Sequence, residues 1–315
     1  MSILGPPFPP AEHQRMTFDA KTWLLIALAA IAVFHLVTIV SAVKRHRAAN
    51  PGEQAMPTGK GLGIGFVTNF FDTLGIGSFA PTTALFRSTK SVSDENIPGT
   101  LNVGHTTATL IEAFIFIAAV QVDPTTLISM IVAATLGAWL GAGVVSKLPK
   151  RAIQWGMGGC LLVAAILMAM SALNVGVTPG DAIGVTGTKL VIAIVGNFIL
   201  GALMTLGIGL FGPCLILVSL LGMTPKAAFP IMMGSCAFLM PLASLQFIRS
   251  LRFDLKAALG LIIGGAPAVL IAAFIVKEMP LNAVRWLVVV VVLYTAATLL
   301  RSALTESPAP AERTA

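Results

Sequence analysis

Charged residues are scarce in this chain. Asp, Glu, Lys and Arg together make up 10% of its 315 residues, whereas hydrophobic residues make up 56%. A soluble domain carries about 25% charged residues, so this composition excludes a soluble globular protein. Several windows of about 20 residues lack any charge and are long enough to cross a hydrocarbon core of about 30 Å. The sequence therefore predicts an all-α polytopic membrane protein.

Cysteine is also rare, and the sequence contains no CxxC pair. The odd count and wide spacing of Cys160, Cys214 and Cys236 indicate neither a disulfide framework nor a zinc site. HExxH and Gly-x-Ser-x-Gly motifs are absent as well, so we expect no catalytic residues, no metal and no cofactor. The net charge of +7 does not indicate nucleic acid, because the basic residues lie in short loops, where orientation signals are expected.

Seven windows are predicted to span the membrane, and two further apolar regions are predicted to be interrupted. The spans are 22–43, 97–120, 125–146, 152–174, 228–248, 257–276 and 283–301, and the interrupted regions are 61–86 and 190–222. We divide the chain into a flexible N-terminal tail (1–21), an extra transmembrane helix with its loop (22–59), a first repeat (60–174), a linker (175–189), a second repeat (190–302) and a disordered C-terminal tail (303–315).

Lys and Arg predict the orientation of these spans, because short cytoplasmic loops carry an excess of both. Lys44, Arg45 and Arg47 follow the first span, which puts its end in the cytoplasm and the N-terminus outside. With the alternation that follows, the inner loops and C-terminus hold 14 Lys and Arg residues and the outer ones hold 6. We therefore predict a multi-pass protein of the bacterial inner membrane with a cytoplasmic C-terminus.

The two interrupted regions must each return to the face from which they enter. In this topology the chain is inside both before and after 61–86, while 190–222 begins and ends outside. The first region, of about 26 residues, gives two helical legs of roughly 20 Å each, which is too short for two crossings, and the second region follows from the topology alone. Each region is therefore predicted to be a re-entrant hairpin of two half-helices, broken at its glycines.

The interrupted regions share a phrase, TLGIGSFAP at 73–81 and TLGIGLFGP at 205–213, and the copies lie 132 positions apart. The same offset brings the three spans that follow the first hairpin close to the three that follow the second. Each half then comprises a hairpin and three spans, and the odd number of crossings inverts the second copy. Such an inverted-topology repeat is typical of secondary transporters, whose broken helices meet near the membrane midplane.

The repeated phrase predicts a chain break followed by a new half-helix. Glycine permits a positive φ and a close backbone approach, and proline fits the first turn of a helix. Free N–H groups and the helix dipole attract negative charge, so two converging half-helix N-termini would bind a small oxyanion. The alternative is that Gly and Pro only kink packed helices. The residues concerned are Gly75, Gly77 and Pro81 in the first copy and Gly207, Gly209 and Pro213 in the second.

Other polar residues near the breaks are candidates for substrate binding. Hydroxyl and amide groups can complete the shell of an oxyanion, but they equally cap helices or bond to nearby carbonyls. The alternative for the histidine is a neutral core residue, and for the cysteine a small core residue. The candidates are Asn69, Thr73, Ser78, Thr82 and His105 in the first half and Asn197, Thr205 and Cys214 in the second.

Asp72 and Glu112 lie inside predicted membrane segments, where carboxylates are costly and are functional candidates. Neither acid is repeated, because the offset of 132 leads to Met204 and Ser244. A carboxylate beside an anion site would repel the substrate unless it were protonated, which suggests proton coupling as a hypothesis. The alternative is a structural hydrogen bond or a pair with His105.

Two Gly-x-Gly-x(3)-Pro phrases in the inverted halves of a small basic membrane protein resemble the TauE/SafE family of sulfite exporters. The resemblance covers roughly residues 60 to 302 and rests on the six motif residues given above. The first copy departs from the family pattern at Ala80, where the second copy has Gly212. Members move sulfite, sulfoacetate or related sulfur-containing anions across the bacterial inner membrane, and the resemblance implies the same class of substrate here.

We therefore expect a secondary transporter of small sulfur-containing oxyanions, without enzymatic activity, that holds the anion between the half-helix N-termini. A channel for anions or small solutes is an alternative, and an intramembrane enzyme is a less favoured one. The expected partners are a small anionic substrate and the lipid bilayer, without nucleic acid, and a homodimer stays open.

Overall fold

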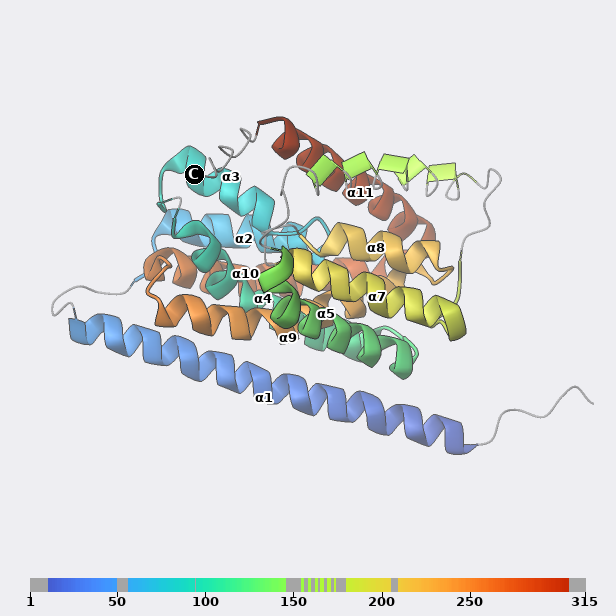
Figure 1. Ribbon diagram of the computed structural model, residues 1–315. Coiled ribbons are helices and arrows are strands. Elements are labelled where there is room, and N and C mark those ends of the chain that lie inside the picture. The colour runs from blue at the N-terminus through green and yellow to red at the C-terminus, as the bar shows by residue number, and fades with distance from the viewer. Residues whose placement is uncertain are drawn as a thin grey trace, which may run out of the picture.

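The computed structural model describes residues 11–49, 56–93, 95–145, 180–204 and 209–305, with short described stretches between 154 and 173. Across these residues the chain is helical, and its β structure is limited to one isolated bridge between Ala182 and Met223. The helices lie side by side with their long axes in roughly one direction (Figure 1). An all-helical protein is therefore confirmed.

Ten helices lie in the described part of the chain. They are α1 (Ala11–Ala49), α2 (Gly59–Thr73), α3 (Phe79–Thr89), α4 (Ile97–Ala119), α5 (Pro124–Val145), α7 (Gly187–Met204), α8 (Phe211–Leu220), α9 (Pro225–Arg249), α10 (Leu255–Glu278) and α11 (Leu281–Thr305). Six of them contain a segment long and apolar enough to cross a membrane. Those segments are Ala20–Ala48, Ile97–Ala119, Gly187–Met204, Pro225–Arg249, Leu255–Val276 and Trp286–Thr305.

The helix boundaries differ from the expected ones in three places. The first helix begins at Ala11, inside the range expected for a flexible tail, and α11 continues to Thr305. The 18 residues of α7 are long enough for a span, whereas we expected a shorter hairpin leg there. Most of the predicted span 152–174 lies outside the described residues. The apolar leg in front of the second phrase is thus longer than the count of residues suggested.

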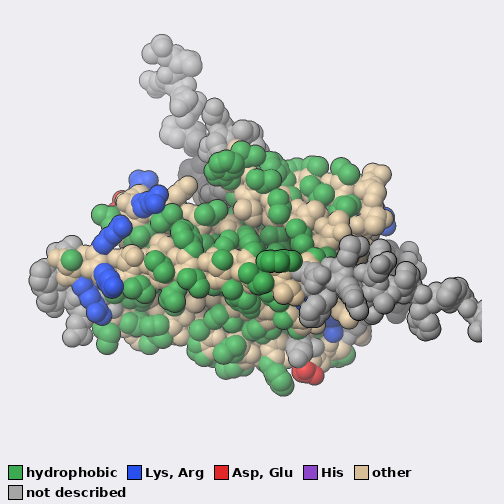
Figure 2. Space-filling view, turned by 90° about the horizontal axis from the view of Figure 1, so that it is seen from below, with side chains coloured by type: hydrophobic (Ala, Val, Ile, Leu, Met, Phe, Trp, Pro, Cys, Tyr) green, Lys and Arg blue, Asp and Glu red, His purple; other side chains and the backbone are tan. Residues whose placement is uncertain are grey.

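The outer surface is apolar, as a lipid environment requires. Large hydrophobic side chains stand outward, among them Trp23 and Phe274, each 69% exposed, and Trp139, 72% exposed. On the face shown in Figure 2, hydrophobic side chains cover the middle, while Lys and Arg gather at one end. An apolar middle is compatible with the hydrocarbon core, and a basic end is compatible with water. The surface and the helix lengths together indicate a multi-pass membrane protein.

The most extensive helix contacts relate the two halves of the chain. The leg before the first phrase, α2, packs against α10, and the leg before the second, α7, packs against α5. Adding 132 to the bounds of α2 gives approximately the bounds of α7, and adding 132 to those of α5 gives approximately those of α10. The pair α2–α10 in one half therefore corresponds to the pair α7–α5 in the other. The helices α4 and α9, which also contact each other extensively, correspond to one another under the same offset. Each leg therefore contacts a helix from the other half.

Small residues permit these close contacts. A Cβ added to Gly65 of α2 would lie 2.6 Å from the backbone oxygen of Gly260 in α10, which is too close. A Cβ added to Gly201 of α7 would meet the backbone of Ala134 in α5. Helix packing in membranes uses such small residues, because they let two backbones approach.

The variant Gly65→Ala is expected to lower the thermal stability of the detergent-solubilised protein. An extra methyl group between packed backbones costs about 1–3 kcal/mol. The control is Gly63→Ala on the same helix, because a Cβ there has no other atom within 4 Å. Alanine favours a helix over glycine by about 1 kcal/mol, so the control keeps or raises the melting temperature. Equal melting temperatures for the two variants would contradict the tight α2–α10 contact.

Candidate functional site

The first phrase breaks the helix. Helix α2 ends at Thr73 and α3 begins at Phe79, with Gly75 at φ 95° and Gly77 at φ 87° between them. Residues with a side chain rarely adopt these φ values, which explains why glycine occupies both positions. In the second copy α7 ends at Met204 and α8 begins at Phe211. The four residues between Met204 and Gly209, which include the candidates Thr205 and Gly207, lie outside the described residues.

Both half-helices begin in the same way. Pro81 is the third residue of α3, and Pro213 is the third residue of α8. The first bond within each helix runs from Thr82 N–H to Ser78 O and from Cys214 N–H to Leu210 O, each 3.0 Å. The backbone N–H groups before the proline have no acceptor inside their helix. Each start therefore offers two such groups, on Phe79 and Ala80 in α3 and on Phe211 and Gly212 in α8.

One small cavity joins the two breaks. Its volume is about 50 Å³. Roughly 10–15 Å³ of such volume holds one water, so this cavity suits a few waters or one small anion. Residues of both phrases line it, together with residues of α2, α4, α7, α9 and α11. They are Asp72, Ile76, Gly77, Ser78, Phe79, Thr109, Met204, Gly209, Leu210, Phe211, Gly212, Cys236, Met240 and Thr295.

Asp72 supplies a carboxyl group at this cavity. It is the penultimate residue of α2 and is 2% exposed. Its carboxylate lies close to the hydroxyl and the backbone N–H of Ser78, which precedes α3. The negative charge of Asp72 thus lies at the positive end of the α3 dipole, where an anion is stabilised.

Glu112 lies behind Asp72 in a second polar group. It projects from α4 and is fully buried, and a charge on it would repel a charge on Asp72. The Thr73 hydroxyl oxygen lies 2.7 Å from Glu112 Oε1 and 2.9 Å from the Asn69 carbonyl oxygen. Glu112 Oε2 has no hydrogen-bond partner among the described residues. One hydroxyl proton therefore faces two acceptors.

His105 ties α2, α3 and α4 together. Its Nδ1 lies 2.8 Å from Asn69 Oδ1, and its Nε2 lies 3.0 Å from Thr82 Oγ1. The Asn69 amide nitrogen donates to the Gly65 carbonyl at 2.7 Å, so its oxygen must face the imidazole. Nδ1 consequently carries a proton and donates, and in the neutral imidazole Nε2 accepts from Thr82. Figure 1 places α2 and α3 on the same side of the bundle, where this chain of bonds connects them.

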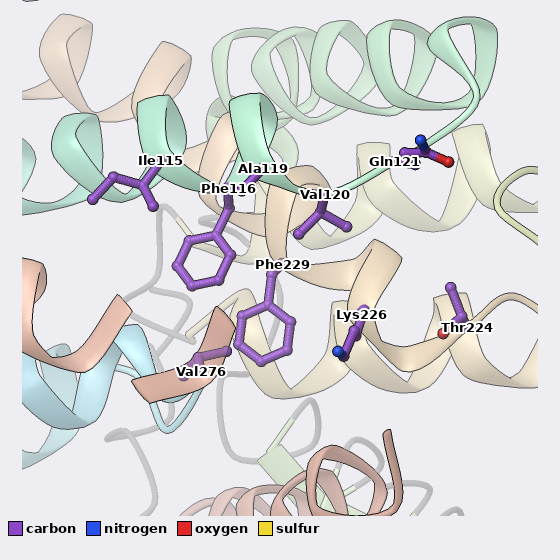
Figure 3. A pocket seen from close by; sticks show the side chains of 9 residues that line it. All are labelled: Ile115, Phe116, Ala119, Val120, Gln121, Thr224, Lys226, Phe229 and Val276. Atoms are coloured by element: carbon purple, nitrogen blue, oxygen red, sulfur yellow. The ribbon is translucent and has the colours of Figure 1, made fainter. Parts of the chain in front are cut away.

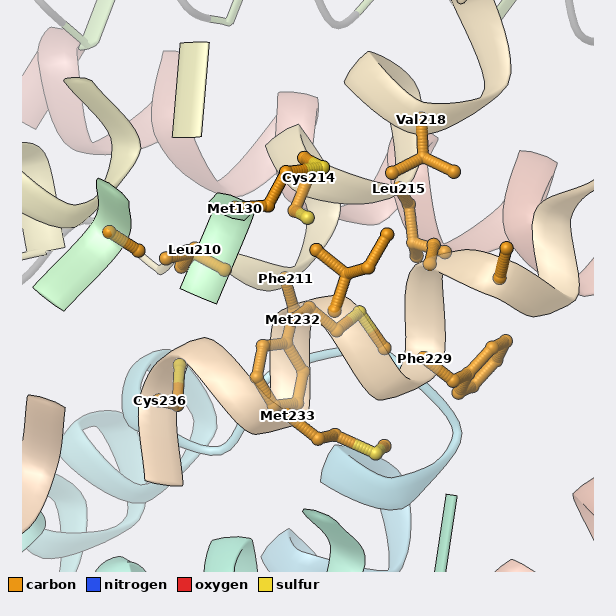
Figure 4. Close-up of a cluster of buried hydrophobic side chains, with 14 of the residues drawn as sticks. Met130, Leu210, Phe211, Cys214, Leu215, Val218, Phe229, Met232, Met233 and Cys236 are labelled. Atoms are coloured by element: carbon orange, nitrogen blue, oxygen red, sulfur yellow. The ribbon is translucent and has the colours of Figure 1, made fainter. Parts of the chain in front are cut away.

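Two candidates from the second half lie apart from the cavity. Asn197 donates to the Met130 carbonyl at 2.7 Å and to the Ser235 hydroxyl at 3.0 Å, and so connects α7 to α5 and α9. Cys214 is fully buried in the apolar cluster that α8 and α9 share, together with Leu215, Phe229 and Met232 (Figure 4). Both contacts are those of packed core residues.

The structure thus divides the candidates of the first half into two groups. Asp72, Gly77 and Ser78 line the cavity, and so does Gly209 of the second half. Asn69, Thr73, Thr82, His105 and Glu112 form the polar contacts around it. Gly75 packs instead against Leu215, Met232 and Phe229.

Sequence reasoning missed several cavity residues. Thr109 lies one helical turn after His105, so the helical period was a usable signal. The second half contributes Met240 and Thr295, which nothing in their sequence surroundings distinguishes. Across the described residues, no group of three His, Cys, Asp or Glu side chains is placed to hold a metal ion.

An all-helical membrane protein with a small cavity between two helix starts fits a solute transporter better than a soluble enzyme. The comparison with protein families agrees: the model described as Sulfite exporter TauE/SafE matches residues 15–168. This part of the chain is therefore similar to a family of membrane transporters, which is not a family of enzymes. The match includes the first span, which the sequence resemblance had left out, and ends before the second phrase. No curated protein and no solved structure matched the chain.

Proposed function

We propose that the protein is a secondary transporter of small sulfur-containing oxyanions, such as sulfite, sulfoacetate or a related organosulfonate, across the bacterial inner membrane. One observation carries the proposal: both phrases contribute to the same cavity, where two helix starts offer backbone N–H groups. An anion in this cavity would lie beside the backbone N–H groups of Phe79, Phe211 and Gly212. Helix N-termini bind anions in this way without arginine.

Alternating access would follow from two inverted halves. The exchange of the pairs α2–α10 and α7–α5 under the offset of 132 supports such a repeat, with two hairpins entering from opposite faces. The distribution of Lys and Arg supports an external N-terminus and a cytoplasmic C-terminus. Rocking of the halves would then expose the cavity to each side in turn. Transport by a carrier, rather than conduction by a channel, is the consequence.

Asp72 and Glu112 would couple this movement to protons. A deprotonated Asp72 occupies the N-terminus of α3, so it competes with the substrate for the same donors. If Glu112 carries a proton, it can donate to the Thr73 hydroxyl oxygen, and the Thr73 hydroxyl can then donate to the Asn69 carbonyl oxygen. Both short distances are then hydrogen bonds. Protonation of Asp72 would free the Ser78 donors for the anion. The hydrogen bonds of His105 to Asn69 and Thr82 would keep α2 and α3 in a fixed position relative to each other.

Flux measurements test the function. Purified protein in liposomes is expected to move sulfite with saturable kinetics and with competition from organic sulfonates, because the anion occupies one small site. Empty liposomes are the control. Conductance that rises without saturation would instead favour the channel, and absence of any anion flux would contradict the proposal.

A further inference from the structure

A second, larger cavity lies at one end of the bundle, away from the two breaks. Its volume is about 230 Å³. The ends of three helices surround it: α4 ends at Ala119, α9 begins at Pro225 and α10 ends at Glu278. Its lining residues are Ile115, Phe116, Ala119, Val120, Gln121, Thr224, Lys226, Phe229 and Val276 (Figure 3). This end is the one that the basic residues predict to be external.

The polar residues of this cavity gather on one side. Gln121 and Thr224 come from the segments that connect helices, and Lys226 comes from the first turn of α9 (Figure 3). The Lys226 ammonium donates one hydrogen bond, of 3.1 Å, to the carbonyl of Met279. An ammonium has three donors, so this bond leaves others for an anion. The mouth of the cavity is therefore suited to attract negative charge.

The opposite side of the cavity is closed by aromatic rings. Phe116 and Phe229 are stacked, with ring centroids 5.2 Å apart, and both are nearly fully buried. Phe229 also packs on the first break, since a Cβ added to Gly75 would lie 3.9 Å from its ring. Gly77, two residues further along, lines the small cavity that joins the two breaks, which we call the central cavity. Phe229 thus lines the larger cavity and also contacts the first break, which contributes residues to the central one.

We propose that the larger cavity is the entry vestibule for the transported anion, that Lys226 attracts the anion there, and that the Phe116–Phe229 pair is the closed gate to the central site. This inference rests on the proposed function. The positions related to the two rings by the offset of 132, Ile97 and Ile248, are each 4% exposed and packed in hydrophobic clusters. These two positions are thus about as buried as the rings to which they correspond.

The lysine is tested by kinetics of sulfite transport in liposomes. The variant Lys226→Met is expected to raise KM for sulfite about tenfold with little change in kcat, because it removes one charge-assisted contact made on entry. Lys189→Met is the matched control. The Lys189 ammonium also donates to a helix-end carbonyl, that of Leu221 at 3.0 Å, but it does not line the vestibule. Equal KM values for the two variants would overturn the role of Lys226.

The gate is tested by labelling Cys236, which lines the central cavity. With Cys160 and Cys214 replaced by alanine, Cys236 is the single thiol, and a negatively charged, membrane-impermeant methanethiosulfonate reports access to it. Phe229→Ala is expected to raise its labelling rate severalfold. Phe86→Ala is the matched control, because Phe86 is as buried as Phe229, at 1% exposure, but belongs to another cluster. Equal labelling rates in the two variants would overturn the gate.

These measurements separate the two proposals. Saturable sulfite transport with no difference between the lysine variants or between the phenylalanine variants would overturn the vestibule and leave the function standing. A wild-type protein that moves no anion would overturn the function, and the labelling of Cys236 would still decide whether the ring pair closes the path.

Discussion

Gly77→Val is expected to abolish sulfite transport in liposomes. Gly77 has a φ of 87° and lines the central cavity, so valine would both strain the break and fill part of the site. A side chain in a left-handed backbone conformation costs roughly 1–3 kcal/mol, which the first break can relieve by moving away from the N-terminus of α3. The start of α3 would then no longer line the cavity together with the second break.

The control is Gly187→Val at the start of α7. Gly187 has a φ of 57°, and a Cβ there has no other atom within 4 Å, so the two variants share the backbone strain. Gly187 does not line the cavity. Transport per folded molecule should therefore fall only for Gly77→Val. Comparable transport by both variants would mean that the geometry of the first break does not hold the substrate.

Asp72→Asn is expected to remove the pH dependence of transport and to lower kcat about tenfold or more. The amide would resemble the protonated acid permanently, so the anion binds but its release is no longer assisted by the returning charge of Asp72. The measurement is the pH profile of flux for a small sulfonate, whose own charge does not change over the range.

The matched control for Asp72 is Asp254→Asn. Asp254 also accepts a backbone N–H at a helix start, that of Ala257 at 2.8 Å, but it lies at the start of α10 and does not line the cavity. Asp254→Asn should keep the wild-type pH profile. A profile that is unchanged in Asp72→Asn would remove Asp72 from proton coupling, while the anion site itself would stand.

The sequence was most informative where the constraint is local. Glycine at Gly75 and Gly77 and proline at Pro81 restrict the backbone by themselves, so a break and a new helix start were predictable from the phrase. Five of the seven predicted spans overlap helices that are long and apolar enough to cross a membrane, because about 20 apolar residues have few alternatives, whereas α7 was expected to be a shorter leg. The candidates Asp72 and Ser78 followed from their position beside the break.

The remainder depends on contacts between distant helices. Nothing near Asn69 in the sequence indicates that its amide oxygen meets His105, 36 positions away, or that Thr82 completes the chain of bonds. Thr205 and Cys214 were chosen by analogy with the first copy, but packing places Cys214 in the core. The vestibule was missed because Phe116 and Phe229 look like ordinary apolar residues until two helices bring their rings together.

The packing of α2 against α10, a helix far along the chain, has a consequence for biogenesis. The glycine face of α2 fits against α10, and Gly260 is synthesised 195 positions after Gly65. While the ribosome makes the intervening chain, α2 has no permanent neighbour on that face. Helices α2 and α3 must therefore wait at the insertion machinery or in lipid until α10 has been made. A truncated chain that ends before α10 should consequently be a substrate for membrane proteases.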